Sequence, residues 1–226
     1  MAKFSDQLTG SHIEFIEAQK MFFVATAPRD GRVNLSPKGL DVFRILGKDR
    51  VAYLDLIGSG NETAAHILEN GRLTFMFCSF DRNPLILRIY CRGRSILPPW
   101  TTASDGGSVG TDGMTSAGAI GDGATGDSAT SETAGDGSEW STIAPAFEVL
   151  PGTRQIILGE ISAVQTSCGF GVPFYEFVSA RDTLVRTAEA HSPEKLLDYQ
   201  RSHNVRSIDG LPTGLFPTTG NEAGNA

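Results

Sequence analysis

The stretch LDLIGSGNETAAHILENGRL (residues 54–73) decides how the fold of this chain is interpreted. An apolar, strand-like run ends in GSGN (58–61), and a helical pattern over 62–70 follows at once. A helix N-terminus offers unpaired N–H groups and a partial positive charge, and glycines let an anion approach the backbone closely. A helix that is simply capped by Asn61 or Ser59 would have the same sequence. The stretch therefore leaves an anion site and a plain helix cap open.

The same stretch also approximates a dinucleotide-binding fingerprint. Its glycines follow a strand and open a helix, and Asp81 lies about twenty residues on, where an acid would bind a ribose. However, Thr63 stands at the position of the third glycine. A nine-residue helix is only about 13 Å long, which is short for a crossover between parallel strands. The fingerprint is therefore disfavoured.

The chain on both sides of this stretch has the pattern of short strands joined by tight turns. Turns such as PRDGR and GKDR separate apolar runs, which is typical of hairpins in an antiparallel sheet. The pattern predicts strands over 21–27, 33–36, 43–46, 51–57, 72–78, 85–96 and 154–167. It predicts helices over 11–20, 62–70, 173–184 and 193–204, the first with Ser11 and Glu14 in capping-box spacing. Six or seven meandering strands with helices at the ends predict a small, mainly β antiparallel barrel.

Length and composition indicate a globular protein with one large domain over residues 1–226. The net charge is −7, and residues 101–139, with five Asp, two Glu and no Lys or Arg, account for all of it. This Gly/Ser/Asp-rich composition predicts a disordered loop inserted at about 99–145, and the C-terminal residues, at about 216–226, a flexible tail. The remainder is neutral, which does not favour nucleic acid as a partner.

Targeting signals and metal-ligand patterns are not recognisable in the sequence. No apolar run approaches the roughly 20 residues needed to cross a bilayer, and the first residues lack the apolar core of a secretory signal. Cys78, Cys91 and Cys168 have no paired spacing, and the four histidines are scattered. We therefore expect a cytoplasmic protein without disulfides, metal or membrane contact.

A second group of polar residues lies in RVNLSPKGLD (32–41). Pro37 cannot donate to a strand ladder, so the strand is expected to break there and leave Asn34, Ser36 and Lys38 at a rim. A lysine at the end of a strand can neutralise a phosphate or favour an anionic ligand ring. A solvated turn lysine would fit the same pattern.

A third group lies in LILRIYCRGR (85–94), where alternation places three arginines and Tyr90 on one strand face. The arginines are Arg88, Arg92 and Arg94. They require anions or carboxylates opposite, which indicates either ligand contacts or a salt-bridged surface.

Taken together, these segments resemble the pyridoxamine 5′-phosphate oxidase-like family of FMN-binding split barrels. The resemblance covers about residues 10–96 and 146–215. It is carried by FFVATAPRDGRVNLSPKG, RVAYLDLIGSGNETAAHILENGRLTFMF and LILRIYCRGR, in that order. The family pattern includes a hairpin ATxxxDGxP, a lysine-ended strand and a short helix leading into ENPRxxLxF, matched here by ENGRLTFMF.

The resemblance implies a six-stranded antiparallel split β-barrel that forms a homodimer, with FMN in each of two clefts between the subunits. It implies an FMN-dependent oxidoreductase acting on a small-molecule substrate, in which the flavin does the chemistry and no catalytic side chain is required. It also implies cofactor contacts along the lysine-ended strand, at the helix start and on the arginine strand. The residues concerned are Asn34, Leu35, Ser36, Pro37, Lys38, Ser59, Gly60, Asn61, Thr63 and Arg88.

The chain departs from the family at Glu62-Thr63, where the oxidases often carry Arg-Lys. A carboxylate repels a phosphate, so Glu62 is expected to face away or to act as a helix-start residue. The phosphate charge would then be met by backbone N–H groups, Ser59, Asn61 and Thr63, with Lys38 or Arg88. The departure argues against pyridoxamine phosphate as the substrate and leaves a deazaflavin open in place of FMN. The alternative function is a flavin-, deazaflavin- or haem-binding sensor or storage protein without turnover.

Overall fold

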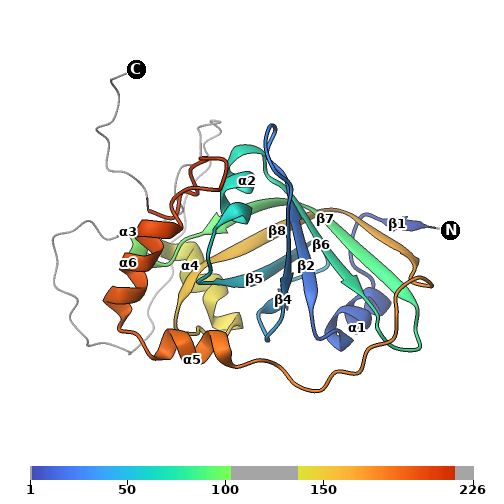
Figure 1. The fold of residues 1–226 in the computed structure, drawn as a ribbon. Helices are drawn as coiled ribbons and strands as arrows, with labels where there is room; N and C mark the ends of the chain where they lie inside the picture. Colours follow the sequence, from blue (N-terminus) through green and yellow to red (C-terminus); the bar gives the residue numbers. More distant parts are fainter. Residues whose placement is uncertain (1, 103–136, 217–226) are drawn as a thin grey trace, which may run out of the picture.

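The computed structural model describes residues 2–102 and 137–216, which form an antiparallel sheet curled into a half-barrel with flanking helices (Figure 1). Its strands are β1 (Lys3–Ser5), β2 (Phe22–Thr26), β3 (Asn34–Lys38), β4 (Phe43–Ile45), β5 (Arg50–Leu56), β6 (Arg72–Cys78), β7 (Leu85–Ile96) and β8 (Thr153–Cys168). Its helices are α1 (Gly10–Ala18), α2 (Glu62–Asn70), α3 (Pro99–Thr102), α4 (Gly137–Ile143), α5 (Thr183–Glu189) and α6 (Pro193–His203), with a 3₁₀ turn, η1 (Ala144–Ala146). None of the helices in the described ranges is both long and apolar enough to cross a membrane.

The strand order is β3-β2-β6-β7-β8-β5-β4, and β1 pairs with β8 outside this path. All of these pairings are antiparallel, which confirms the predicted mainly β split barrel. The described part of the chain has eight strands, one more than the seven ranges that the pattern predicts and two more than the six that the resemblance implies. β1 was not predicted because three residues are too few to show an alternating pattern.

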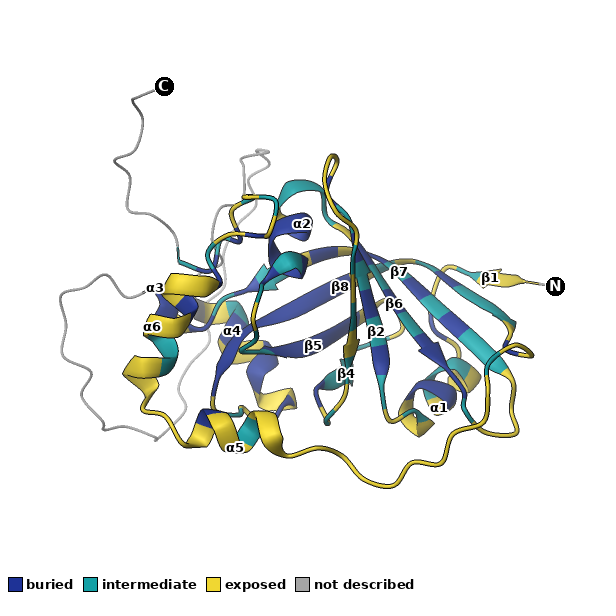
Figure 2. Ribbon diagram, in the orientation of Figure 1, coloured by how far each residue is buried: buried dark blue, intermediate teal, exposed yellow. Residues whose placement is uncertain are grey.

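The core is an aromatic cluster enclosed by the curled sheet. Strand residues alternate between buried and partly exposed positions, and β2 does so over its whole length. The buried faces carry rings that meet mainly edge to face, with centroids 5.0–6.1 Å apart: Phe22, Phe43, Tyr53, Phe75 and Phe77. Figure 2 shows that the buried residues follow the strands, whereas α5 and α6 are mainly exposed. The sheet therefore supplies a rigid frame for the loops at its end.

The N-cap of the first helix lies two residues before the predicted one. Thr9 caps α1: its hydroxyl oxygen accepts from the backbone N–H of His12, and the His12 ring nitrogen accepts from the Thr9 N–H. The box is thus formed by Thr9 and His12, not by Ser11 and Glu14. Histidine at the third helical position replaces the usual Glu or Gln, so the sequence does not show the usual capping-box pattern here.

The predicted strand break at Pro37 is wrong. β3 continues to Lys38, and Pro37 lies opposite Phe23 of β2. Among the described strands β3 pairs with β2 alone and lies at the edge of the sheet, so the missing N–H of proline can face away from β2. The continuation matters for function because it holds Lys38 on the sheet.

Two other segments differ from the predicted pattern. Residues 173–182 have no helical structure, and α5 begins only at Thr183, so the helix expected over 173–184 is wrong. The ends of the expected 99–145 loop form α3, α4 and η1, and Trp100 contacts Trp140 edge to face. Residues 103–136, and 217–226 of the expected tail, lie outside the described residues.

Candidate functional site

A cavity of about 1180 Å³ opens between the ends of β3 and β5, the turn before α2, and a segment over 177–187. Eight of the ten predicted site residues line it: Asn34, Ser36, Pro37, Lys38, Ser59, Gly60, Asn61 and Thr63. A smaller cavity of about 360 Å³ lies between α1, β2 and β4, and none of the ten lines it. The structure therefore brings two separately predicted groups into one site.

Leu35 and Arg88 lie elsewhere. Leu35 is 62% exposed and does not line the cavity. Arg88 lies on β7, where its guanidinium donates to the hydroxyl of Ser167 on β8. Arg94, on the same strand, pairs with Glu139 of α4. The arginines Arg88 and Arg94 therefore do not reach this cavity, and the predicted salt-bridged surface is found at Arg94.

The turn before α2 leaves the helix N-terminus without a side-chain cap. Asn61 precedes the first helical residue, but its side chain makes no hydrogen bond to the helix backbone. Instead its amide oxygen accepts from Gln155 at 2.9 Å and its amide nitrogen donates to the carbonyl of Asn204 at 3.4 Å. The plain-cap interpretation is therefore wrong for Asn61. N–H groups at an uncapped helix start are suited to an anion.

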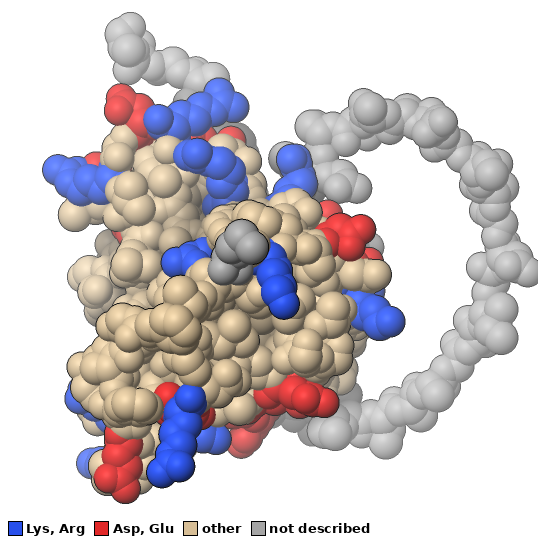
Figure 3. Space-filling view, turned by 90° about the vertical axis from the view of Figure 1, so that its right-hand side faces the viewer, with Lys and Arg blue, Asp and Glu red and all other residues tan. Residues whose placement is uncertain are grey.

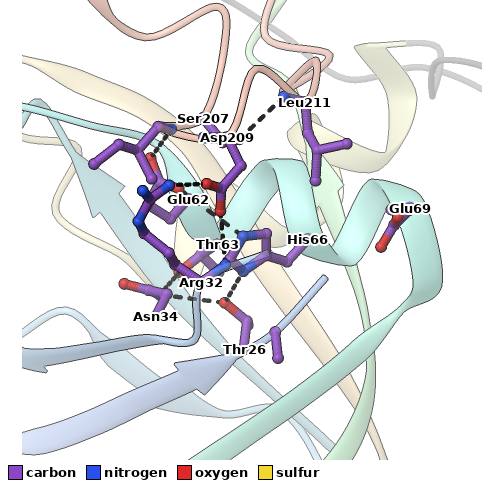
Figure 4. A network of polar contacts seen from close by, with 12 residues as sticks. Thr26, Arg32, Asn34, Glu62, Thr63, His66, Glu69, Ser207, Asp209 and Leu211 are labelled. Atoms are coloured by element: carbon purple, nitrogen blue, oxygen red, sulfur yellow. Dashed lines mark hydrogen bonds and ion pairs between the residues drawn. The ribbon is translucent and has the colours of Figure 1, made fainter. Parts of the chain in front are cut away.

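A chain of hydrogen bonds joins β3 to the start of α2 (Figure 4). The Asn34 amide donates to the hydroxyl oxygens of Thr26 and Thr63, at 3.2 and 3.1 Å, and its own oxygen accepts from Ser36 at 2.9 Å. Thr26 also contacts the fully buried His66 of α2 at 3.0 Å. These contacts fix the distance between the strand edge and the helix start.

Glu62 is held by the segment that follows α6. One of its carboxylate oxygens accepts from the backbone N–H of Ile208 at 2.9 Å. The neighbouring Asp209 pairs with Arg32, and the backbone N–H of Arg32 is the main reason that the pKa of Asp209 lies below its usual range. Figure 4 shows Glu62, Asp209 and Arg32 close together beside α2. Glu62 is a helix-start residue, which was one of the two expectations, but it also lines the cavity and so does not face away from it.

The floor of the cavity is a buried ion cluster around Asp55. This carboxylate lies 3.3 Å from the Lys38 ammonium nitrogen and 2.9 Å from the Arg154 guanidinium, and it accepts from Gln155 at 3.0 Å. Burial raises the pKa of Asp55, but the positive charges of Arg154 and Lys38 outweigh it and leave the pKa below its usual value. Asp55 is therefore ionised. The Lys38 ammonium also lies 5.4 Å from the centre of the Tyr53 ring.

Asp55, Arg154 and Gln155 were not among the predicted site residues. A signal was present in each case: Asp55 is the only charged residue in the apolar run VAYLDLI, and Arg154 and Gln155 stand immediately before IILG. Buried charges and amides need partners, so polar residues in otherwise apolar strands indicate pairing. Their partners could not be named from the sequence.

Two segments from the C-terminal part contribute to the site: one supports the turn before α2, and the other lines the cavity. Asn204, which is fully buried after α6, donates to the carbonyl of Gly58 at 3.0 Å. The segment 177–187 contributes Phe177, Arg181 and Leu184 to the lining. No group of three or more His, Cys, Asp or Glu residues suited to a metal ion occurs among residues 2–102 and 137–216.

A curled antiparallel sheet whose end holds a cavity, with an uncapped helix start beside a buried ion cluster, defines a split-barrel protein. Residues 8–99 match the family model of pyridoxamine 5′-phosphate oxidase. The chain is 35% identical to the pyridoxamine 5′-phosphate oxidase family protein ustO of Aspergillus flavus, over 94% of this chain and 78% of that protein. The chain belongs to the pyridoxamine 5′-phosphate oxidase family.

Similarity to solved structures is weaker. HupZ from Group A Streptococcus is 13% identical, with a TM-score of 0.43, covering 70% of this chain and 91% of that one. The FAD binding protein from Mycobacterium smegmatis is 10% identical, with a TM-score of 0.41, covering 72% and 97%.

Proposed function

We propose that this protein is an FMN-dependent oxidoreductase that acts on a small-molecule substrate. The observation that carries the proposal is that the uncapped start of α2 opens on the same cavity as Lys38. A ligand with a phosphate at one end and a flat ring at the other suits this arrangement. Membership of the pyridoxamine 5′-phosphate oxidase family supports a flavin as that ligand.

The donors in the cavity fit the two ends of FMN. Backbone N–H groups of residues 61–63 and the hydroxyls of Ser59 and Thr63 are suited to the phosphate. Lys38, with its ammonium held beside Asp55, would place a positive charge near the ring and favour its reduced, anionic form. Asn34 and Ser36 would orient the ring along β3. Bound FMN supplies the redox chemistry by accepting a hydride from the substrate.

We also propose that two copies form a homodimer with the flavin between them. The surface in Figure 3 has a broad uncharged area, with charged side chains mainly toward its rim. Large apolar side chains are exposed on β1 and on the segment after β8: Phe4, Phe170, Phe174, Tyr175, Phe177 and Val178. Exposed apolar patches of this kind mark interfaces. The predicted flavin contacts of Leu35 and Arg88 would then be made across the interface.

We also propose a cytoplasmic location, where thiols stay reduced. Cys78 and Cys91 are buried and Cys168 is exposed, and all three are free. Burial raises the pKa of the Cys91 thiol to about 12, so this thiol is unreactive.

Purification tests the proposed function directly. We expect absorbance in the flavin bands, release of FMN on denaturation, and reduction of the bound flavin by a hydride donor under anaerobic conditions. Bound chromophore that no donor reduces would favour the sensor or storage alternative. Colourless protein that takes up no added FMN would overturn the proposal, and sedimentation as a monomer in the presence of FMN would overturn the dimer.

A further inference from the structure

We propose that Arg154 is the positioning residue that makes the cavity select a phosphorylated flavin over an unphosphorylated one. The inference rests on the proposed function, because it assigns a role within the same site. Arg154 supplies, from β8, a positive charge that the segment 58–63 lacks, since the only charged residue in that segment is Glu62.

An irregularity in the sheet aims Arg154 at this site. Consecutive strand residues normally point to opposite faces, yet Arg154 and Gln155 both contact the Asp55 carboxylate. The register between β5 and β8 shifts here: Asp55 lies opposite Gln155, and Leu56 lies opposite Thr153. Arg154 is thus the extra residue of a β-bulge. Bulges redirect side chains and are frequent beside functional sites.

The guanidinium of Arg154 connects the floor of the cavity to the turn before α2. One terminal nitrogen lies 2.9 Å from the Asp55 carboxylate, and the other donates to the carbonyl of Gly60 at 2.7 Å. In a trans peptide the C=O and the following N–H point in opposite directions. Holding the Gly60 carbonyl toward Arg154 therefore turns the Asn61 N–H away from it. Arg154 thus fixes the orientation of this turn.

The cluster also has an unbalanced charge. Lys38 and Arg154 contribute two positive charges and Asp55 one negative charge, which leaves one positive charge beneath the turn. The Arg154 side chain is only 4% exposed, and its Nε atom is buried with no hydrogen-bond partner among the described residues. Glu62, the other carboxylate lining the cavity, lies outside this cluster: one of its oxygens accepts from the Ile208 N–H, and the other lies 3.9 Å from the His66 Nε2 atom. A charge shielded from water acts strongly on a nearby anion.

Affinities for FMN and riboflavin separate this role from a general structural one, because riboflavin lacks the phosphate. We expect Arg154→Gln to weaken FMN binding at least about tenfold, or 1.4 kcal/mol, and riboflavin binding less than about twofold. Arg154→Lys keeps the charge and is expected to retain most of the preference for FMN. Arg50→Gln, which removes an exposed arginine from β5, is the matched control and should bind both as the wild type does.

Equal loss of both flavins in folded Arg154→Gln, or an unchanged FMN preference, would overturn the inference. If Arg154→Gln does not fold, loss of the preference in Arg154→Lys would overturn it instead. Wild-type protein that binds neither flavin would overturn the proposed function. In that case the melting temperature is measured in inorganic phosphate and in an equal concentration of chloride. A higher melting temperature in phosphate for the wild type, but not for the Arg154 variants, upholds the anion role of Arg154. Any other pattern overturns it.

Discussion

The side-chain amide of Asn34 donates a hydrogen bond to the hydroxyl oxygen of Thr63 at 3.1 Å, across 29 positions of sequence. Asn34 belongs to the lysine-ended edge strand, and Thr63 belongs to the first turn of α2. The two polar groups that the sequence singles out separately are therefore parts of one cavity wall. Their contact has consequences for ligand binding that can be measured.

Replacing Asn34 with alanine removes both hydrogen bonds that its amide donates to Thr26 and Thr63. Each such bond is worth about 0.5–1.5 kcal/mol, so we expect roughly tenfold weaker FMN binding and a lower melting temperature. Fluorescence titration with FMN measures the first effect. Val33→Ala, at a side chain that is 75% exposed, is the control. Equal affinity in both variants would contradict the placement of β3 along the ligand.

Removal of the Lys38 ammonium should lower the flavin content of the purified protein. Lys38→Ala takes away the positive charge beside the proposed ring position and leaves Asp55 with Arg154 as its charged partner and Gln155 as its hydrogen-bond donor. We expect a similar loss in Asn61→Ala, because Asn61 connects the turn to Gln155. The measurement is the flavin content per chain, determined by absorbance. Lys48→Ala, which removes an exposed lysine, is the control. Full occupancy in both site variants would count against the site.

Stability should fall in acid because of Asp55. Its pKa is lowered in the folded protein, so its stabilising effect is complete above the unfolded pKa of about 3.9 and is lost as pH falls through the folded value. Urea unfolding at a series of pH values should show this loss below about pH 4. Asp55→Asn should flatten that slope and cost about 3–5 kcal/mol at neutral pH, since it leaves buried cations unpaired. Asp41→Asn, at a side chain that is 90% exposed, should change neither.

The centre of the sheet tolerates no side chain at Gly159. A Cβ atom there would lie 2.9 Å from the Cys91 sulfur and 3.1 Å from the Phe75 ring, both in the core. Overpacking of this kind costs about 1–3 kcal/mol, so Gly159→Ala should lower the urea midpoint. Gly171→Ala, where nothing lies within 4 Å of the added atom, should leave the midpoint unchanged. If Gly159→Ala has the same urea midpoint as the wild type, the core around Gly159 can rearrange to accept the added methyl group.

Two deletions of the acidic segment should differ in stability. Joining residue 102 to 137 with a short Gly/Ser linker keeps Thr101, which is buried, and Glu139, which pairs with Arg94. Deleting 101–139 removes both and shortens α4, which carries the buried Trp140. We expect the first variant to melt close to the wild type and the second several degrees lower. Equal melting temperatures would show that these helix ends add nothing to stability.

The sheet was predictable because its signal is local. Alternating apolar positions and Gly/Asp turns marked seven of the eight strands within one or two residues, apart from the early stop at Pro37. The rule that proline interrupts a strand fails here, since proline is excluded from central strands but not from an edge strand. The helix expected over 173–184 failed for a related reason. Its apolar spacing suits a helix, yet its aromatic side chains are exposed, and the Tyr175 ring packs against Phe80 and not against the buried core.

The sequence by itself determined the strand and turn pattern, the short helix after the glycine turn and the family, because each depends on neighbouring residues. Only the tertiary structure decided that Asp55, Arg154 and Gln155 lie beneath that turn. Gln155 and Asp55 are 100 residues apart, and their contact depends on strand register and on one bulge. Buried polar groups must be paired, but the partner is chosen by the fold as a whole.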